Sequence, residues 1–210
     1  MEVYNAKFGL VAGRPKEEEG GILPEVGILA KAAKFGIVAR GPTAGRFEGD
    51  VEVTGDIRLL NADCAEDFDV SANGSQTIEP GTVMVLNDVG NLEPSIQAYD
   101  KKVAGVISGA SGYKPGIVLD THHREEEQEQ ESDDDAARRR MPVALVGKVY
   151  CKVDATISAI EVGDLLTTSS AEGHAMKASD PINAFGTVIG KALKPLREGR
   201  GLIPILIALQ

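Results

Sequence analysis

Two carboxylates, Asp63 and Glu66, are the residues of this chain whose type and spacing could do chemistry. They flank Cys64 where a light, Gly/Val-rich segment gives way to a longer β-rich one. Two carboxyl groups can divide general acid and base roles when their environments separate their pKa values, as burial of one would. The simpler alternative is a junction turn in which these acidic side chains face water.

The composition predicts an all-β protein of ordinary globular character. Hydrophobic residues make up 42% of the 210 positions and charged residues 26%, which is enough to build a core. Aromatic residues are only 4% and Trp is absent, so the core must be made from Val, Ile, Leu and Ala, with 24 Gly and 10 Pro between its elements. This balance favours many short strands.

The charge and hydropathy patterns exclude several classes of partner. A formal charge of −10 argues against nucleic acid and against an anionic membrane surface, both of which attract clustered Lys and Arg. No segment reaches the roughly 20 apolar residues of a membrane span, and no basic stretch leads into an apolar run as in a signal peptide. We therefore expect a protein that is not exported by a standard signal, which favours a cytoplasmic location.

Residues 1–57 predict a short β-stem. The unit 6–13 is echoed at 33–41, and each echo is a strand-like run closed by Gly. The stretch 47–57 then alternates apolar and polar residues with Gly-Asp corners, like one rung of an interwoven stem. Such strands are too light to bury both faces within one chain, so we expect them to need neighbouring copies. The alternative is an ordinary edge hairpin of the next domain.

Residues 58–210 predict one β-domain with two similar halves, 78–119 and 160–207. The turn Ile78–Gly81 matches Ile160–Gly163, and Val103–Ser108 matches Val188–Leu193. The final strands are matched as 117–119 with 202–207. Halves this small should pack together as a sandwich or barrel. The acidic stretch 122–140 lies between them and is predicted to be a mobile surface insertion.

Other candidate sites are weak. Cys64 and Cys151 each precede the turn of their own half and could pair as a disulfide, although two free thiols are the commoner outcome in a reducing compartment. His122-His123 stands beside many carboxylates, but adjacent side chains diverge and we expect no metal site. Ser169, Ser170 and His174 lack a nucleophile elbow and fit a polar hairpin better. No phosphate-binding loop is present, so no cofactor is expected.

Three motifs carry a family resemblance. The stretch Asn61–Phe68, followed by Val103–Gly109 and Val143–Val149, resembles the peptidase G2 family of intramolecular-chaperone domains at the C-termini of phage tailspikes and preneck appendages. The similarity covers about residues 58–210, and Asp63-x-Ala65-Glu66-x-Phe68 is its most specific part. The resemblance implies a homotrimer whose C-terminal domain aligns three chains and then cuts itself free, and it implies a virion-associated or appendage-associated protein as the alternative to a cytoplasmic one.

Carried over residue by residue, the resemblance implies that Asp63 and Glu66 are the active carboxylates and that the scissile bond lies near Ala62–Asp63. Amide hydrolysis needs a base for water, an acid for the leaving nitrogen and donors for the oxyanion. Because Ala62 offers no hydroxyl nucleophile, water would attack, with Glu66 as base and Asn61 or a backbone N–H steadying the oxyanion.

Three functions stay open from the sequence. The first is a structural trimerisation or assembly domain of a phage-derived tail-fibre-like or appendage protein, with other appendage or tail components as possible partners. The second is a single-turnover self-cleaving peptidase. The third is a monomeric binding module, which would expose one large apolar patch.

Overall fold

The computed structural model describes residues 34–35, 37–71, 78–121 and 138–208. The chain divides into two units, Met1–Asp56 and Ile57–Gln210, and each is considered by itself. Within the described residues, no helix has the length and apolar character needed to cross a membrane.

The described part of the first unit carries apolar side chains without a core. Residues 37–56 contain no strand, so the strands expected over 47–57 are not formed within one chain. The reason is physical: an isolated extended segment has no partner for its backbone groups and nothing to bury its side chains against. The large apolar residues that are exposed here are Phe35, Ile37, Val38, Phe47, Val51 and Val53.

The second unit is all-β, which confirms the predicted fold class. Its strands are β1 (Asp63–Ser71), β2 (Val83–Leu86), β3 (Leu92–Pro94), β4 (Val103–Ile107), β5 (Pro115–Leu119), β6 (Arg138–Asp154), β7 (Leu165–Thr168), β8 (Ala175–Lys177), β9 (Val188–Ala192) and β10 (Arg200–Ala208). One short helix, α1 (Pro181–Ala184), precedes β9 and is capped by Asp180.

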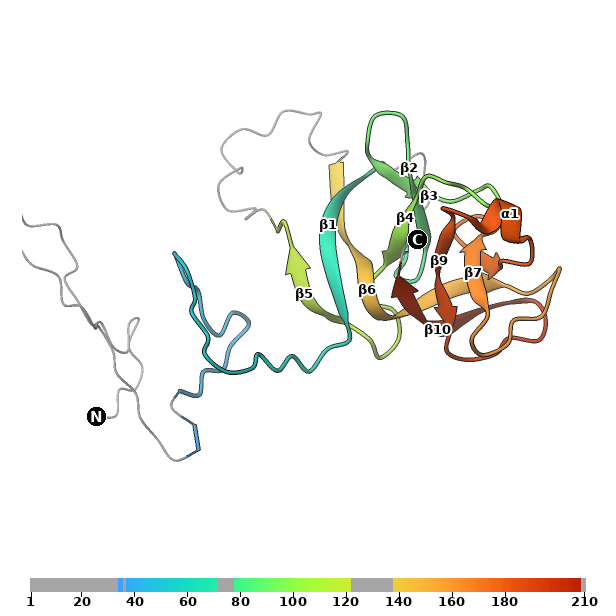
Figure 1. Cartoon of the computed structure of the whole chain (residues 1–210). Helices are drawn as coiled ribbons and strands as arrows, with labels where there is room; N and C mark the ends of the chain where they lie inside the picture. Colours follow the sequence, from blue (N-terminus) through green and yellow to red (C-terminus); the bar gives the residue numbers. More distant parts are fainter. Residues whose placement is uncertain (1–33, 36, 72–77, 122–137, 209–210) are drawn as a thin grey trace, which may run out of the picture. The chain divides into compact units, whose positions relative to one another are not determined.

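The strand pairings close two rings that share β6. In the first ring β6 pairs with β4, β4 with β2, β2 with β3, β3 with β1, and β1 again with β6. In the second ring β6 pairs with β8, β8 with β7, β7 with β9, β9 with β10, and β10 again with β6. Figure 1 shows β6 running from the first group of strands into the second.

Each ring encloses its own hydrophobic core. The first is filled by Val70, Met84, Leu92, Ile107, Met141 and Val143. The second core is larger, extends over the outer side of the first ring, and includes Cys151, Val153, Leu166, Ala175, Ile189, Ala192, Ile203 and Ile205. A closed ring pairs its own strands on both sides, so such a domain leaves few backbone groups unpaired.

The two rings repeat the same local geometry. Gly81 and Gly163 precede β2 and β7 with φ of 92° and 91°, a region in which a Cβ would be strained. The amide of Gly81 donates to Ile107 O, and that of Gly163 donates to Ala192 O. The register between β2 and β4 shifts directly after the pair Met84–Gly105, and the register between β7 and β9 shifts directly after the pair Leu166–Gly190.

The sequence match of 117–119 with 202–207 pairs two strands, β5 and β10, that have different places in the fold. β5 pairs parallel with β1, whereas β10 pairs antiparallel with β9 and β6, so 117–119 and 202–207 have different neighbours. By hydrogen bonding, the counterpart of β10 is the first part of β6: the amide of Ser108 donates to Pro142 O, and that of Leu193 donates to Pro204 O. β5 therefore lies outside the first ring. Superposition of 78–119 on 160–207 stays a prediction.

Both cysteines of the chain are free thiols, so the Cys64–Cys151 disulfide is not formed. Cys151 lies inside the second ring, where burial raises the pKa of its thiol to about 12. Cys64 is half-buried on β1. Most of the acidic insertion, residues 122–137, lies outside the described residues.

Replacing Gly190 with Ala tests the close approach of β9 to β10. A Cβ at Gly190 would lie 2.1 Å from Leu206 O and 2.9 Å from Ile207 Cα, both backbone atoms that cannot move aside. We expect a loss of about 1–3 kcal/mol or more in the free energy of unfolding, measured by urea denaturation. Gly112→Ala is the matched control, because nothing lies within 4 Å of its added Cβ. Equal stability of the two variants would contradict the pairing.

Candidate functional site

The site is built around Asp63, the first residue of β1. It is buried, with 5% of its surface exposed, and its strand pairs with β5 on one side and β6 on the other. The interpretation of this residue as part of a solvated turn is therefore wrong. Burying a carboxyl group in a sheet costs free energy, because the group loses the hydration it has in water.

Ser108 is the polar partner of Asp63. It follows β4, is 3% exposed, and its Oγ donates to Asp63 Oδ2 at 2.6 Å. The other carboxyl oxygen, Oδ1, is buried without a hydrogen-bond partner among the described residues. Burial raises the pKa of Asp63 above its ordinary value, and the hydrogen bond from Ser108 acts in the opposite direction. The raised pKa favours a protonated carboxyl group.

The peptide before Asp63 is held by hydrogen bonds to β6 on one side and to the residue before β5 on the other. Ala62 O accepts the amide of Lys148 at 3.3 Å, and Ala62 N donates to Lys114 O at 3.0 Å. Gly147 makes this approach possible, because a Cβ there would lie 2.7 Å from Ala62 O. Its φ of 113° also lies in the region that favours glycine. The Ala62–Asp63 bond thus has one N–H on its carbonyl and one acid beside its nitrogen.

The structure does not bring Glu66 to this acid. Asp63 and Glu66 are three residues apart on a strand, and side chains at odd separations point to opposite faces of a sheet. The extra residues at the two register shifts belong to β5 and β6, so β1 keeps its alternation. Glu66 is half-buried, and Asn61, the expected oxyanion donor, is exposed. The donor to Ala62 O is the amide of Lys148 instead.

The backbone bond made by Ser108 does not require a hydroxyl. At the equivalent position the second ring has Leu193, whose amide makes the corresponding bond to Pro204 O. The surroundings differ, because Leu193 is 37% exposed whereas Ser108 is 3% exposed and donates to a buried acid. A buried carboxyl group with one oxygen unpaired among the described residues is uncommon, which marks the pair as a candidate functional site.

Sequence reasoning missed Ser108 and Lys148 as members of the site. Both stand in the motifs Val103–Gly109 and Val143–Val149, so the motif match was a signal that they matter. Their proximity to Asp63 could not be read from spacing, since Ser108 is 45 positions away and the contact depends on how β4 and β6 close the first ring.

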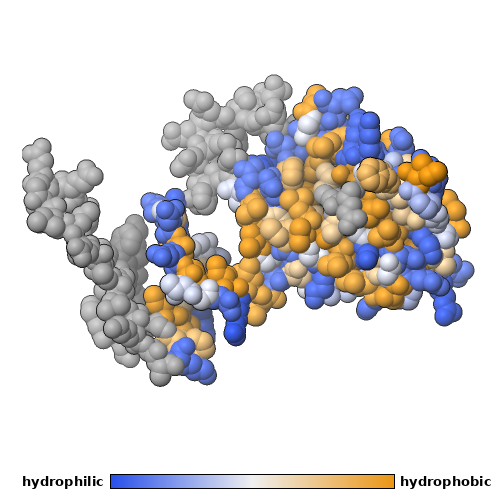
Figure 2. All heavy atoms as spheres, viewed as in Figure 1, coloured by the Kyte–Doolittle hydropathy of each residue, from blue (hydrophilic) through white to orange (hydrophobic). Residues whose placement is uncertain are grey.

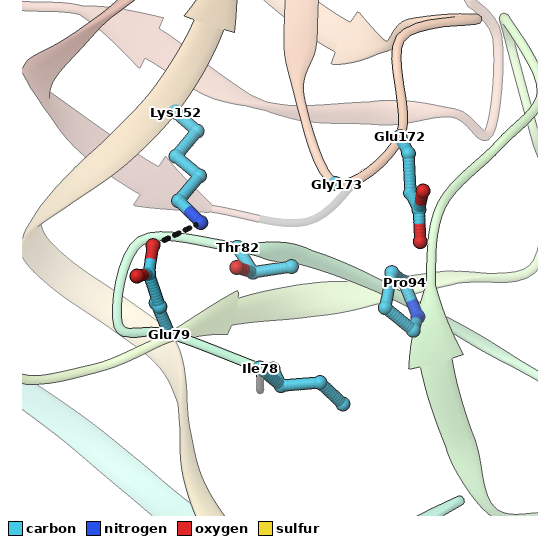
Figure 3. Close-up of a pocket in the computed structure, with 7 residues that line it drawn as sticks. All are labelled: Ile78, Glu79, Thr82, Pro94, Lys152, Glu172 and Gly173. Carbon is cyan, nitrogen blue, oxygen red and sulfur yellow. Dashed lines mark hydrogen bonds and ion pairs between the residues drawn. The ribbon is translucent and has the colours of Figure 1, made fainter. Parts of the chain in front are cut away.

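A groove lies where the two rings meet. It has a volume of about 300 Å³ and is lined by Ile78, Glu79, Thr82, Pro94, Lys152, Glu172 and Gly173. Figure 3 shows Lys152 reaching Glu79, with Nζ and Oε2 3.0 Å apart. The described residues hold no cluster of His, Cys, Asp or Glu able to bind a metal ion. The groove offers no catalytic constellation.

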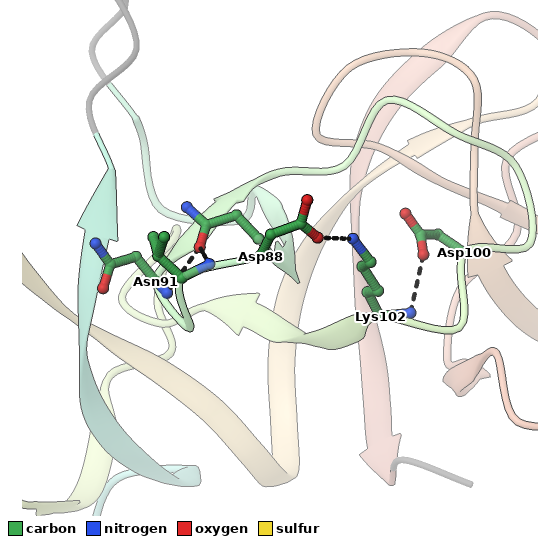
Figure 4. Close-up of polar contacts among 6 residues, drawn as sticks. Asp88, Asn91, Asp100 and Lys102 are labelled. Atoms are coloured by element: carbon green, nitrogen blue, oxygen red, sulfur yellow. Dashed lines mark hydrogen bonds and ion pairs between the residues drawn. The ribbon is translucent and has the colours of Figure 1, made fainter.

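Other polar groups serve turns. Asn87 Oδ1 accepts the amides of Val89 and Asn91, and Lys102 pairs with Asp88 at 2.8 Å beside this loop (Figure 4). In the equivalent hairpin of the second ring, the amide of Ser169 donates to His174 O and its Oγ accepts the amide of Ala171. These residues hold hairpins, as the polar-hairpin interpretation of Ser169 and His174 predicted.

Comparison with known proteins gives structural likenesses, two of them to proteins of bacteriophage phi29. No family model matches this chain, and no curated protein does. The pre-mature gene product 12 of bacteriophage phi29 is similar with a TM-score of 0.48 and 18% identity, over 79% of this chain. The N base of the head fiber gp8.5 of the same phage is similar with a TM-score of 0.33 and 18% identity, over 68% of this chain and 92% of its own. This chain spans 24% of the gene product 12 chain. Likeness at this level assigns no activity.

Replacing Asp63 with Asn should flatten the pH dependence of stability. The folded-state pKa of Asp63 is raised, so between the ordinary value of about 3.9 and that raised value the folded protein binds more protons than the unfolded chain. The contribution of Asp63 to the free energy of unfolding therefore falls as the pH rises through this window. In urea denaturation from pH 3.5 to 8, the free energy of unfolding should fall less for Asp63→Asn than for the parent chain.

Asp180→Asn is a control of opposite sign. The amides of Asn183 and Ile182 donate to Asp180 and lower its pKa, so its contribution is present at neutral pH and is lost as the pH falls. Asn also caps helices well, so the helix should persist. A pH profile of Asp63→Asn that matches the parent chain would contradict a raised pKa for the buried Asp63.

Proposed function

We propose that this chain is a structural assembly domain of a phage-type appendage and that it acts as a homotrimer. In this proposal the domain 58–210 brings three chains into register, and the segment 1–57 forms a stem between them. The appendage setting follows from the motifs at 61–68, 103–109 and 143–149, which resemble those of the peptidase G2 family.

The exposure of the apolar side chains in the described stem is the observation that carries the proposal. Phe47, Val51 and Val53 keep 75%, 60% and 46% of their surface in water, although they alternate with polar residues as a strand would. At about 25 cal/mol per Å², burying such side chains between copies is favourable, and the pairing of three extended segments would also satisfy their backbone groups.

A monomeric binding module is the competing function. It would need one contiguous apolar patch for its ligand. The groove between the rings is lined largely by polar residues, and its Lys152 is paired with Glu79, which gives such a ligand little to bind. The exposed apolar residues of the described stem are distributed along an extended segment, a pattern that suits association between chains.

Self-cleavage is a second candidate function, favoured by the arrangement at the Ala62–Asp63 bond. In this candidate water adds to the Ala62 carbonyl carbon and releases its protons to solvent, the Lys148 amide stabilises the developing oxyanion, and the Asp63 carboxyl group protonates its own backbone nitrogen as the C–N bond breaks. The products are an Ala62 carboxylate and an Asp63 amine, and the side chain of Asp63 is left as a carboxylate. Glu66 could act as base only after β1 changes its conformation, because it lies on the other face of the strand.

Light scattering tests the assembly proposal. The full chain should have a mass close to three times 22.1 kDa at micromolar concentration. Val51→Asp with Val53→Asp should lower this mass, because charges replace the apolar face of the stem, while Ile182→Asp at an 88% exposed position on α1, outside the stem, serves as the control. A monomeric parent chain would refute the proposal.

Intact mass spectrometry distinguishes the two candidate functions. A self-cleaving chain gives fragments 1–62 and 63–210 over days, and Asp63→Asn should abolish them if the acid protonates the leaving nitrogen. Ser108→Ala should change the rate and its pH dependence. Glu66→Gln tests the base directly. A chain that stays uncut and forms a trimer would support the structural function and contradict self-cleavage.

A further inference from the structure

β5 differs from the other described strands in having a single partner. It pairs with β1, whereas the other strands of the two rings each pair with at least two described neighbours. Its far edge has no strand partner among the described residues. An edge with unpaired N–H and C=O groups is a template for another strand.

This edge is also apolar on both faces. Ile117, Val118 and Leu119 are exposed by 43%, 37% and 48%, so neither face of β5 is buried in its own chain. Natural edges are usually protected by charge, by Pro or by a bulge. Here the Pro and the register shift fall at the start of the strand and leave 117–119 unprotected. Figure 2 shows apolar residues along the flank of the domain that carries β1 and β5 in Figure 1.

A positive charge beside this edge lacks an acidic partner. Lys114 directly precedes β5 and is exposed. Its backbone oxygen accepts the amide of Ala62, which holds the start of the strand. Lys114 forms no ion pair with a described carboxylate.

The segment 50–57 has the complementary pattern. Val51 and Val53 alternate with Asp50 and Glu52, and none of the acidic residues in this segment forms an ion pair within the described chain. Its apolar side chains are exposed and it forms no strand. It therefore has free backbone groups, one apolar face and one acidic face.

We propose that the open edge of β5 is an intersubunit contact and that it takes the segment 50–57 of a second copy as an added strand. This inference rests on the proposed homotrimer and names the surface through which copies meet. The added strand would bury Val51 and Val53 beside Ile117 and Leu119, and would place Asp50 and Glu52 on the side of the strand that faces Lys114. Contact between different surfaces of successive copies is heterologous, which is what a closed ring of three requires.

Cysteine crosslinking between two differently tagged chains tests the contact. Both chains carry Cys64→Ser to remove the half-exposed thiol, while the buried Cys151 stays. One chain carries Ile117→Cys or Leu119→Cys, and the other carries Val51→Cys or Val53→Cys. After co-expression and mild oxidation, we expect a disulfide between the two tags, since pairing strands bring Cα atoms within the roughly 4.4–6.8 Å that a disulfide needs. Ile182→Cys, an 88% exposed position on α1, replaces the β5 cysteine as control.

The outcomes separate the inference from the proposed function. Mixed-tag disulfides at β5 but not at Ile182, in a protein of trimeric mass, support both. A trimer without mixed-tag disulfides at any of the four pairs overturns the β5 contact and leaves the assembly function standing. A monomeric mass overturns both. A disulfide that forms within one chain when it carries both cysteines, in a monomer, means that β5 is capped in cis and also overturns the inference.

Val118→Lys provides a second, independent measurement. A Lys in the middle of the open edge should shift the mass from trimer to monomer at micromolar concentration, with the thermal midpoint of the monomeric domain unchanged because Val118 is exposed. Ile182→Lys introduces the same charge at an exposed site and should leave the trimer intact. Trimers that persist in Val118→Lys contradict the proposed edge.

Discussion

The fold depends on β6, the strand that both rings use. Its first part pairs with β1 and β4, and its second part pairs with β8 and β10. Met141 and Val143 enter the first core, while Val149, Cys151 and Val153 enter the second. Neither ring can close without it, so the two small cores are expected to unfold together rather than as independent domains. Each core alone would be marginal, and sharing one strand joins them.

The same strand creates the candidate site. Gly147 and Lys148 stand where β6 passes from one ring to the other, and they hold the peptide before Asp63. The buried acid costs stability, because Asp63 Oδ1 has no partner among the described residues. An unsatisfied buried polar group costs about 1–3 kcal/mol. The second ring makes the corresponding backbone bond with Leu193, so the bond itself does not require the polar pair.

Local signals in the sequence predicted the local structure. The turns before β2 and β7 were identified from Ile78–Gly81 and Ile160–Gly163, because glycine with positive φ leaves a readable pattern. The all-β class followed from the light, Gly-punctuated composition. Asp63 was identified as a site residue, but the resemblance paired it with Glu66, and strand alternation separates these two side chains.

Long-range features could not be predicted from spacing. The contact between Asp63 and Ser108 joins residues from β1 and the end of β4, and it exists because both strands pair with β6. The match of 117–119 with 202–207 was drawn from equal glycine separations, yet β5 lies outside the ring and Pro142 takes the place equivalent to Pro204. The stem strands were expected from alternation, but a single chain offers them no partners.

The proposed assembly depends on an open β5 edge that is filled by a second copy. Hydrogen exchange of the 116–120 amides in the full-length chain tests it most directly. In the assembled protein, the outward-facing amides of β5 should be protected as strongly as those of β1 and should lose this protection on dilution below the assembly concentration. Rapid exchange of these amides in a protein whose mass is trimeric would contradict the account.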